Sequence, residues 1–220
     1  TQYLVKHTIA INWAISVNTA NLTRQEAHMA YHGVLQAQLG YSLGTTTFTP
    51  RQLKPIQSII DQAYKPKIGL NRNFPTAVLQ GPPEYNGLST IPLITTQGFK
   101  QTQLLIGSLR NEDDTGKLIN ATLQYEQLDS GLTTAILSKP TTLQYQTWTT
   151  PTWISSLKRF LHTMRAEIII PGQWLPSLQR ENDISIMSAL VSHFPNNHTL
   201  HRQMNRCRKF LQVTTLSDIT

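Results

Sequence analysis

The sequence has only one cysteine, Cys207, among its 220 residues, which excludes an internal disulfide framework and a cysteine-rich zinc module. Charged residues are also scarce, at 14% against roughly 25% in an average soluble protein. No apolar run approaches the ~18 residues of a membrane-spanning helix. Because the chain begins with Thr1 and shows no signal-peptide pattern, we expect a piece of a longer polypeptide.

Motifs for common catalytic chemistry are missing too. The sequence has no Gly-x-Ser-x-Gly elbow, no Cys/His nucleophile signature and no glycine-rich phosphate loop. The one acidic cluster, Glu112-Asp113-Asp114, has the residue types of a two-metal site. Adjacent residues on a helix do not face one another, whereas acids at a helix start satisfy open amides. We therefore expect a helix cap and no metal centre here.

Histidines near the end of the chain allow a zinc interpretation, which we weigh against a simpler one. The candidate ligands are His193, His198, His201 and Cys207. One thiol and loose spacing are weak support for a metal. Cys207 falls on the apolar stripe of a predicted helix, so we expect a small buried hydrophobic residue there.

What is present is enough apolar sequence for a core, 39% of residues, and a net charge of +7. The basic charge is concentrated in residues 1–110, which hold nine Lys and Arg against three Asp and Glu. Residues 111–220 hold ten and nine. This balance suggests contact with a polyanion.

Helical periodicity dominates the chain, so the predicted fold class is mainly α. We expect a helical bundle at 1–80 and a mostly helical extension at 81–220 with one or two short strands, divided softly near 81–92 by Gly81-Pro82-Pro83 and Asn86-Gly87. Residues 166–170 are expected as a strand or an extended run, and 138–149 as a strand or a loop. The expected helices are 23–39, 50–64 (starting at Pro50 or at Pro55), 93–109, 114–130, 151–164, 182–193 and 199–212.

The apolar residues of two of these helices predict which faces are buried. In 114–130 the predicted inner residues are Leu118, Ala121 or Thr122, Tyr125 and Leu128. In 199–212 they are Leu200, Met204, Cys207 and Leu211. At about 100° per residue, Arg202, Arg206 and Lys209 then form a basic stripe on the opposite face. Such a stripe is either a solvated surface or a phosphate contact.

A resemblance to a known family rests on several segments. Asn71-Arg72-Asn73-Phe74-Pro75-Thr76-Ala77-Val78-Leu79-Gln80-Gly81-Pro82 and Asn86-Gly87-Leu88-Ser89-Thr90-Ile91-Pro92 resemble the region after the palm in reverse transcriptases of non-LTR retrotransposons. Residues 103–111, 114–118, 178–183 and 205–213 agree with it. The sequence departs from the family at Asn86, where a glycine is usual, and at Ser89-Thr90, where a single glycine is usual.

The resemblance implies the thumb and post-thumb portion of an RNA-directed DNA polymerase, not catalytic by itself. The family's aromatic-any-Asp-Asp box is absent from residues 1–220, so the catalytic palm would lie upstream, and Mg²⁺ would belong to that palm. This chain would need no cofactor. Helices 23–39 and 50–64 are the thumb candidates. Expected nucleic-acid contacts are Lys54, Lys65, Lys67 and Arg72, with Arg202, Arg206 and Lys209 as a second group.

The implied partners are an RNA–DNA hybrid or template–primer duplex and the upstream palm and fingers, with no membrane. An active parent element would place the protein in the nucleus. Two alternatives remain open. One is a non-catalytic helical protein-interaction domain whose basic faces are merely solvated. The other is an independent enzyme, such as a hydrolase that uses one of the seven histidines.

Overall fold

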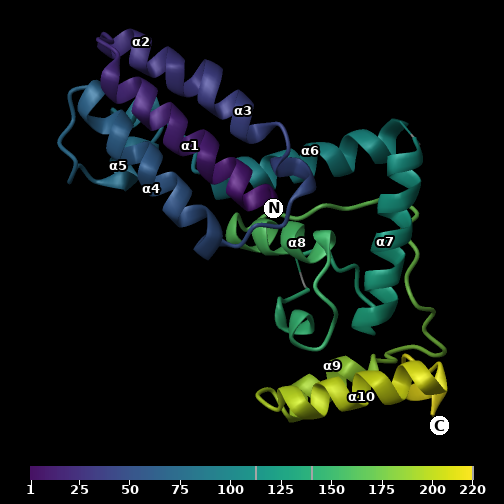
Figure 1. Ribbon diagram of the computed structural model, residues 1–220. Helices are drawn as coiled ribbons and strands as arrows, with labels where there is room; N and C mark the ends of the chain where they lie inside the picture. Colours follow the sequence, from purple (N-terminus) through teal and green to yellow (C-terminus); the bar gives the residue numbers. More distant parts are fainter. Residues whose placement is uncertain (112, 140, 220) are drawn as a thin grey trace. The chain divides into compact units, whose positions relative to one another are not determined.

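The computed structural model describes residues 1–111, 113–139 and 141–219, and most of them are helical, as predicted (Figure 1). The chain divides into two compact units, Thr1–Gln103 and Leu104–Thr220. The division falls inside the helix α6, Leu93–Asn111. No helix in the described part of the chain is both long and apolar enough to span a membrane.

The first unit is built from helices whose starts are fixed by local capping. Thr23 and Glu26 form a reciprocal capping box, and so do Thr49 and Gln52. The helix capped by Thr49 begins at Pro50, because a proline at the first helical position loses no hydrogen bond. Pro55 therefore lies inside this helix. The elements are α1 (Gln2–Thr19), α2 (Arg24–Met29), a π-helical segment (Ala30–Leu35), α3 (Gln36–Gly40), α4 (Pro50–Lys67) and α5 (Thr76–Gln80).

Aromatic residues from three helices meet in the core of the first unit. Tyr31 stacks on Tyr64 with ring centroids 4.6 Å apart, and Trp13 of α1 meets Tyr31 edge-on. Both tyrosines are at most 1% exposed, and burial raises the pKa of each to about 12. The helix α1 packs along α4, and it was not expected from the sequence.

The units divide later in the chain than the predicted boundary at 81–92. The turn residues do punctuate the chain there, but they fold back on α5 and remain in the first unit. Ser89 N donates to Gly81 O at 3.0 Å, and Thr90 Oγ1 donates to Leu79 O at 2.8 Å. Leu88 and Leu93 pack against the core of the first unit. A turn signal marks a change of direction and not the end of a core.

The second unit contains α7 (Asp114–Ser130), α8 (Trp153–Thr163), α9 (Ile186–His193) and α10 (His198–Leu211). Residues 166–170 form neither a helix nor a strand, and the described residues of 138–149 form a loop with a 3₁₀ turn at Gln144–Thr147. In place of the expected short strands, the described residues form one isolated antiparallel bridge between Ser185 and Thr215.

The predicted inner face of α7 is wrong. Leu118, Tyr125 and Leu128 are 68%, 55% and 48% exposed, whereas Ile119, Leu123, Glu126 and Asp129 are buried. The buried face is therefore turned by about one residue and is partly polar. The buried acids Glu126 and Asp129 accept hydrogen bonds from polar groups elsewhere in the same unit. Glu126 accepts hydrogen bonds from the hydroxyls of Tyr145 and Ser155, at 3.1 and 2.9 Å, and from that of Thr152.

The start of α8 shows why Glu126 lies inside the unit. Thr152 is the N-cap of α8 and forms a capping box with Ser155, so α8 begins two residues beyond the start of the predicted helix 151–164. Both side chains also donate to Glu126. The carboxyl of α7 thus joins the start of α8, and burial raises its pKa above the usual range.

Candidate nucleic-acid interface

The basic face of α10 is the best-formed candidate site, and it depends on what α10 buries. His201, Asn205 and Arg208 point inward and are at most 2% exposed. The predicted inner residues Cys207 and Leu211 are instead exposed, so the expectation of a buried cysteine is wrong. At about 100° per residue, Arg202, Arg206 and Lys209 flank the buried face and do not lie opposite it. All three are exposed.

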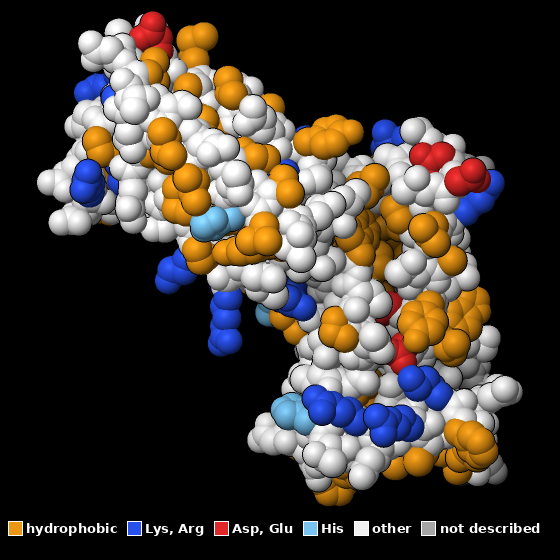
Figure 2. Space-filling view, in the orientation of Figure 1, with side chains coloured by type: hydrophobic (Ala, Val, Ile, Leu, Met, Phe, Trp, Pro, Cys, Tyr) orange, Lys and Arg blue, Asp and Glu red, His pale blue; other side chains and the backbone are white. Residues whose placement is uncertain are grey.

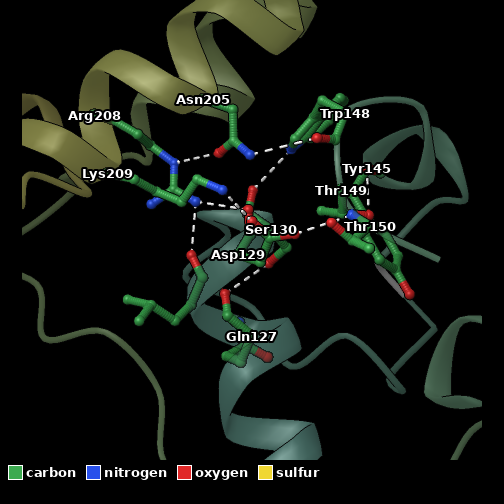
Figure 3. A network of polar contacts seen from close by, with 11 residues as sticks. Gln127, Asp129, Ser130, Tyr145, Trp148, Thr149, Thr150, Asn205, Arg208 and Lys209 are labelled. Atoms are coloured by element: carbon green, nitrogen blue, oxygen red, sulfur yellow. Dashed lines mark hydrogen bonds and ion pairs between the residues drawn. The ribbon is translucent and has the colours of Figure 1, made fainter. Parts of the chain in front are cut away.

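Arg208 anchors α10 on the C-terminal end of α7 (Figure 3). Its Nη2 donates to the carbonyl oxygens of Leu128 and Asp129, at 2.6 and 2.7 Å, and its Nε donates to Asn205 Oδ1 at 2.8 Å. The last carbonyls of a helix have no partner within it and carry partial negative charge, so a cation stabilises them. Burial lowers the pKa of Arg208 to about 10. Because this value is still well above neutral pH, the guanidinium remains charged.

The loop before α8 braces the same helix end (Figure 3). Trp148 Nε1 donates to Ser130 O at 3.1 Å, and Thr150 N donates to Asp129 Oδ2 at 3.1 Å. Lys209 Nζ lies 2.6 Å from Asp129 Oδ1. The loop, α7 and α10 are therefore held in one arrangement by hydrogen bonds that are largely buried.

This arrangement leaves a pocket of about 410 Å³ between the loop and the basic flank of α10. Arg202 donates from Nε to Thr147 O at 2.9 Å, which aims its side chain along the loop. In Figure 2 the Lys and Arg side chains gather side by side over α10. The pocket is lined by Gln146, Thr147, Trp148, Thr149, Thr150, Pro151, Arg202, Asn205, Arg206 and Lys209. All three residues of the second predicted group are thus brought together.

The first predicted group is only partly brought together. Lys54, Lys65 and Arg72 line a pocket of about 490 Å³ in the first unit. Lys54 and Arg72 are exposed, but Lys65 is 6% exposed and donates from Nζ to Phe74 O at 2.9 Å. Asp61 lines the same pocket, and burial raises its pKa.

Lys67 lies outside that pocket and completes a helix end. Its Nζ donates to Ala20 O at 2.8 Å and to Asn18 O at 3.3 Å, at the C-terminal end of α1. Lys6 does the same for α3, with Nζ donating to Leu39 O at 2.7 Å and to Gln38 O at 3.0 Å. Like Arg208, these lysines stabilise carbonyls that have no helical partner.

Reasoning from the sequence missed Arg208, Asn205 and Lys6. Arg208 and Lys6 donate hydrogen bonds to backbone carbonyls, and Asn205 accepts a hydrogen bond from Arg208. A signal for Arg208 and Asn205 was present. His201, Asn205 and Arg208 repeat at the same i, i+4, i+7 spacing as the basic stripe, shifted by one residue. Spacing alone does not say which of two adjacent polar stripes is buried.

The acidic cluster behaves as a helix cap. Asp113 is the N-cap of α7 and accepts from Gly116 N at 2.6 Å. Asp114, in the first turn, pairs with Lys117 at 3.0 Å on the surface. Glu112 lies outside the described residues. The capping interpretation of Asp113 is therefore confirmed.

No protein-family model matches this chain, and neither a curated protein nor a solved structure matches it.

Proposed function

We propose that this chain is a nucleic-acid-holding segment of a retroelement reverse transcriptase, which grips a template–primer duplex and does no chemistry by itself. The observation that carries the proposal is the pocket in which Arg202, Arg206 and Lys209 lie beside the 146–151 loop. The resemblance of residues 71–92 to the family and the basic first half of the chain add to it.

The geometry suits phosphate contact better than base recognition. Arginine presents several donors in a planar fork that matches phosphate oxygens. Gln146, Thr147 and Thr150 add neutral polar side chains to the lining of the same pocket. Contacts of this kind position a duplex without reading its sequence. We therefore infer sequence-tolerant binding, with the polymerase palm and its Mg²⁺ supplied by the upstream part of the same polypeptide.

The test is a charge reversal in the pocket. The double variant Arg202→Glu/Arg206→Glu should weaken binding to a labelled RNA–DNA hybrid by tenfold or more at low salt, because each change replaces a phosphate-binding cation by an anion. The matched control is Arg110→Glu/Lys117→Glu, which makes the same charge change at two exposed residues that line no described pocket. Equal weakening by both variants would indicate a net-charge effect and would refute the assigned interface.

A second candidate function is a protein-interaction domain, and a specific observation favours it. Leu4, Ile11 and Ile15 are 59%, 36% and 57% exposed on α1, on the face opposite its buried residues. Figure 2 shows hydrophobic side chains over this helix. Charged groups are depleted in the centres of protein interfaces, and no exposed residue of α1 is charged.

This second function makes its own prediction. The variant Leu4→Ser/Ile15→Ser should abolish a protein contact and leave hybrid binding unchanged. The pocket variant Arg202→Glu/Arg206→Glu should do the reverse if the nucleic-acid proposal is right. Hybrid binding that survives the pocket variant would favour the protein-interaction function.

A further inference from the structure

A pocket of about 630 Å³ lies in the first unit, between α2 and the segment that follows α4. Its volume is within the range of sites that hold small organic ligands, about 300–1,000 Å³. The proposed nucleic-acid contacts Lys54, Lys65, Lys67 and Arg72 do not line it, so it is a separate site. The described residues of its lining are Thr23, Arg24, Gln25, His28, Tyr64, Ile68, Leu70 and Leu88.

One side of the pocket is an aliphatic wall, formed where the chain turns back after α4. Gly69 adopts the left-handed conformation, with φ of +82°, and Leu70 N donates to Lys65 O at 2.9 Å. This pattern is typical of a helix that ends at a glycine. Ile68 is buried, whereas Leu70 and Leu88 are partly buried and pack against the core of the first unit. Aliphatic side chains that remain partly open to a pocket favour an apolar group of a ligand.

The cation of the pocket is Arg24, at the start of α2. Its guanidinium lies against Gly69, since a β-carbon built on this glycine would be 2.6 Å from Arg24 Nη2. No hydrogen bond or ion pair to another residue that the structure describes engages this guanidinium. Glu26, the nearest acid in the sequence, is held by Thr23, whose N and Oγ1 donate to Glu26 Oε2 at 2.8 Å. Arg24 is therefore available to an anion.

Polar side chains of the lining lie on the same side as Arg24. Thr23, Gln25 and His28 belong to α2 or cap it, and all three are exposed. The ring of His28 is held in place by α4, because its Nδ1 lies 2.9 Å from the hydroxyl oxygen of Tyr64. The pocket is therefore polar along α2 and apolar along the wall that follows α4.

The charge and the surface of the lining define the class of ligand. None of the described lining residues is acidic, so nothing in the lining offsets the charge of Arg24. Arginine binds carboxylates through two parallel hydrogen bonds. The only aromatic carbocycle among the same residues is Tyr64, which is completely buried and stacks on Tyr31. It presents no open ring face, so the lining fits an aliphatic chain better than a nucleobase, which binds by stacking.

We propose that this pocket binds a small amphipathic carboxylate, an aliphatic chain with one anionic head. Arg24 holds the carboxylate on the α2 side, and Ile68, Leu70 and Leu88 cover the chain. Each methylene that leaves water on binding adds to the affinity. The site goes beyond the proposed nucleic-acid function and shares no residue with it.

Calorimetric titration of the whole chain with octanoate tests the proposal. We expect one equivalent to bind, with affinity rising about three- to fourfold for each methylene added between butanoate and octanoate. Arg24→Gln should weaken octanoate binding about tenfold or more, because it removes the charged partner of the head. It should leave the binding of neutral octan-1-ol unchanged.

Arg51→Gln is the matched control, the same change at an exposed cation of α4 outside this pocket. It should bind octanoate as the unchanged protein does. Both arginines are exposed, so neither substitution opens the core, and circular dichroism checks that each variant is folded. No binding of octanoate, affinity that does not vary with chain length, or equal weakening by the two variants would overturn the proposal.

Titration of the same variants with the RNA–DNA hybrid separates this proposal from the nucleic-acid function. Arg24→Gln should leave hybrid binding unchanged, and Arg202→Glu/Arg206→Glu should leave octanoate binding unchanged. An Arg24→Gln variant that loses hybrid binding but keeps octanoate binding would assign Arg24 to the nucleic acid and would overturn the carboxylate site.

Discussion

Gly131 lies directly against the guanidinium of Arg208: a β-carbon built on this glycine would overlap the Nε and Cζ atoms of the arginine. Gly131 ends α7 in the left-handed conformation, with φ of +67°. The glycine therefore has two roles, because it turns the chain and leaves room for the cation that satisfies the carbonyls of α7. The position of α10, and with it the basic pocket, depends on this contact.

Replacing Arg208 should destabilise the second unit. Arg208→Met leaves the carbonyls of Leu128 and Asp129 without their charged donor, and we expect a loss of about 2–4 kcal/mol, the range for breaking a buried charged interaction. Urea unfolding measures it. Arg206→Met, at an exposed position of the same helix, should stay within about 0.5 kcal/mol. Equal effects of the two variants would contradict the anchoring role.

Alanine substitutions at two glycines compare the cost of a strained backbone and a steric clash with the gain from higher helix propensity. Gly131→Ala should destabilise the protein by more than about 1 kcal/mol, because alanine disfavours positive φ and its β-carbon displaces Arg208. Gly107→Ala, inside α6 with no atom within 4 Å of the added carbon, should stabilise it by about 0.5–1 kcal/mol. Thermal unfolding of both variants would show opposite shifts; shifts of the same sign would contradict the assignment.

The local part of the fold was predictable from the sequence, and the reason is physical. Capping at Thr23 and Asp113 involves residues within three positions of each other, so the pattern contains both partners. The helix α1 escaped detection because Leu4, Ile11 and Ile15 make its outer face apolar as well, which removes the amphipathic period.

The inner faces of α7 and α10 could not be read from the sequence in the same way. Arg208 is buried because its partners are carbonyls 79 and 80 positions earlier in the chain. Glu126 is buried because Thr152 and Ser155 begin a later helix. Hydrophobic periodicity assigns such residues to solvent, since it counts the cost of burying a charge but not its distant partners. Helical spacing alone was enough to predict that Arg202, Arg206 and Lys209 share one side of α10, but not that this side flanks the buried face.

Glu126 should give the second unit a distinct pH dependence. Burial raises the pKa of this carboxyl above its unfolded value of about 4.3, so the folded state binds the proton more tightly. Its contribution to stability is therefore greatest below the unfolded pKa and is lost as pH rises through the folded pKa. Glu126→Gln removes the titration, so its stability should fall less than that of the unchanged protein between about pH 4 and pH 7.

Urea unfolding at a series of pH values measures this difference. Other groups titrate in both proteins, so the informative quantity is the stability of the variant minus that of the unchanged chain. Asp218→Asn is a useful control. Hydrogen bonds from backbone amides lower the pKa of that carboxyl, so its contribution should be lost as pH falls. A difference for Glu126→Gln that does not vary with pH would contradict the assignment.

The most direct test of the proposed function is the salt dependence of hybrid binding by the whole chain. Each cation that neutralises a phosphate adds about −0.9 to the slope of log affinity against log salt. Lys54, Arg72, Arg202 and Arg206 are exposed cations that line the two basic pockets. We therefore predict a slope of about −2 to −4, independent of the sequence of the hybrid. No binding at about 50 mM salt, or binding with a slope near zero, would contradict a phosphate-gripping role.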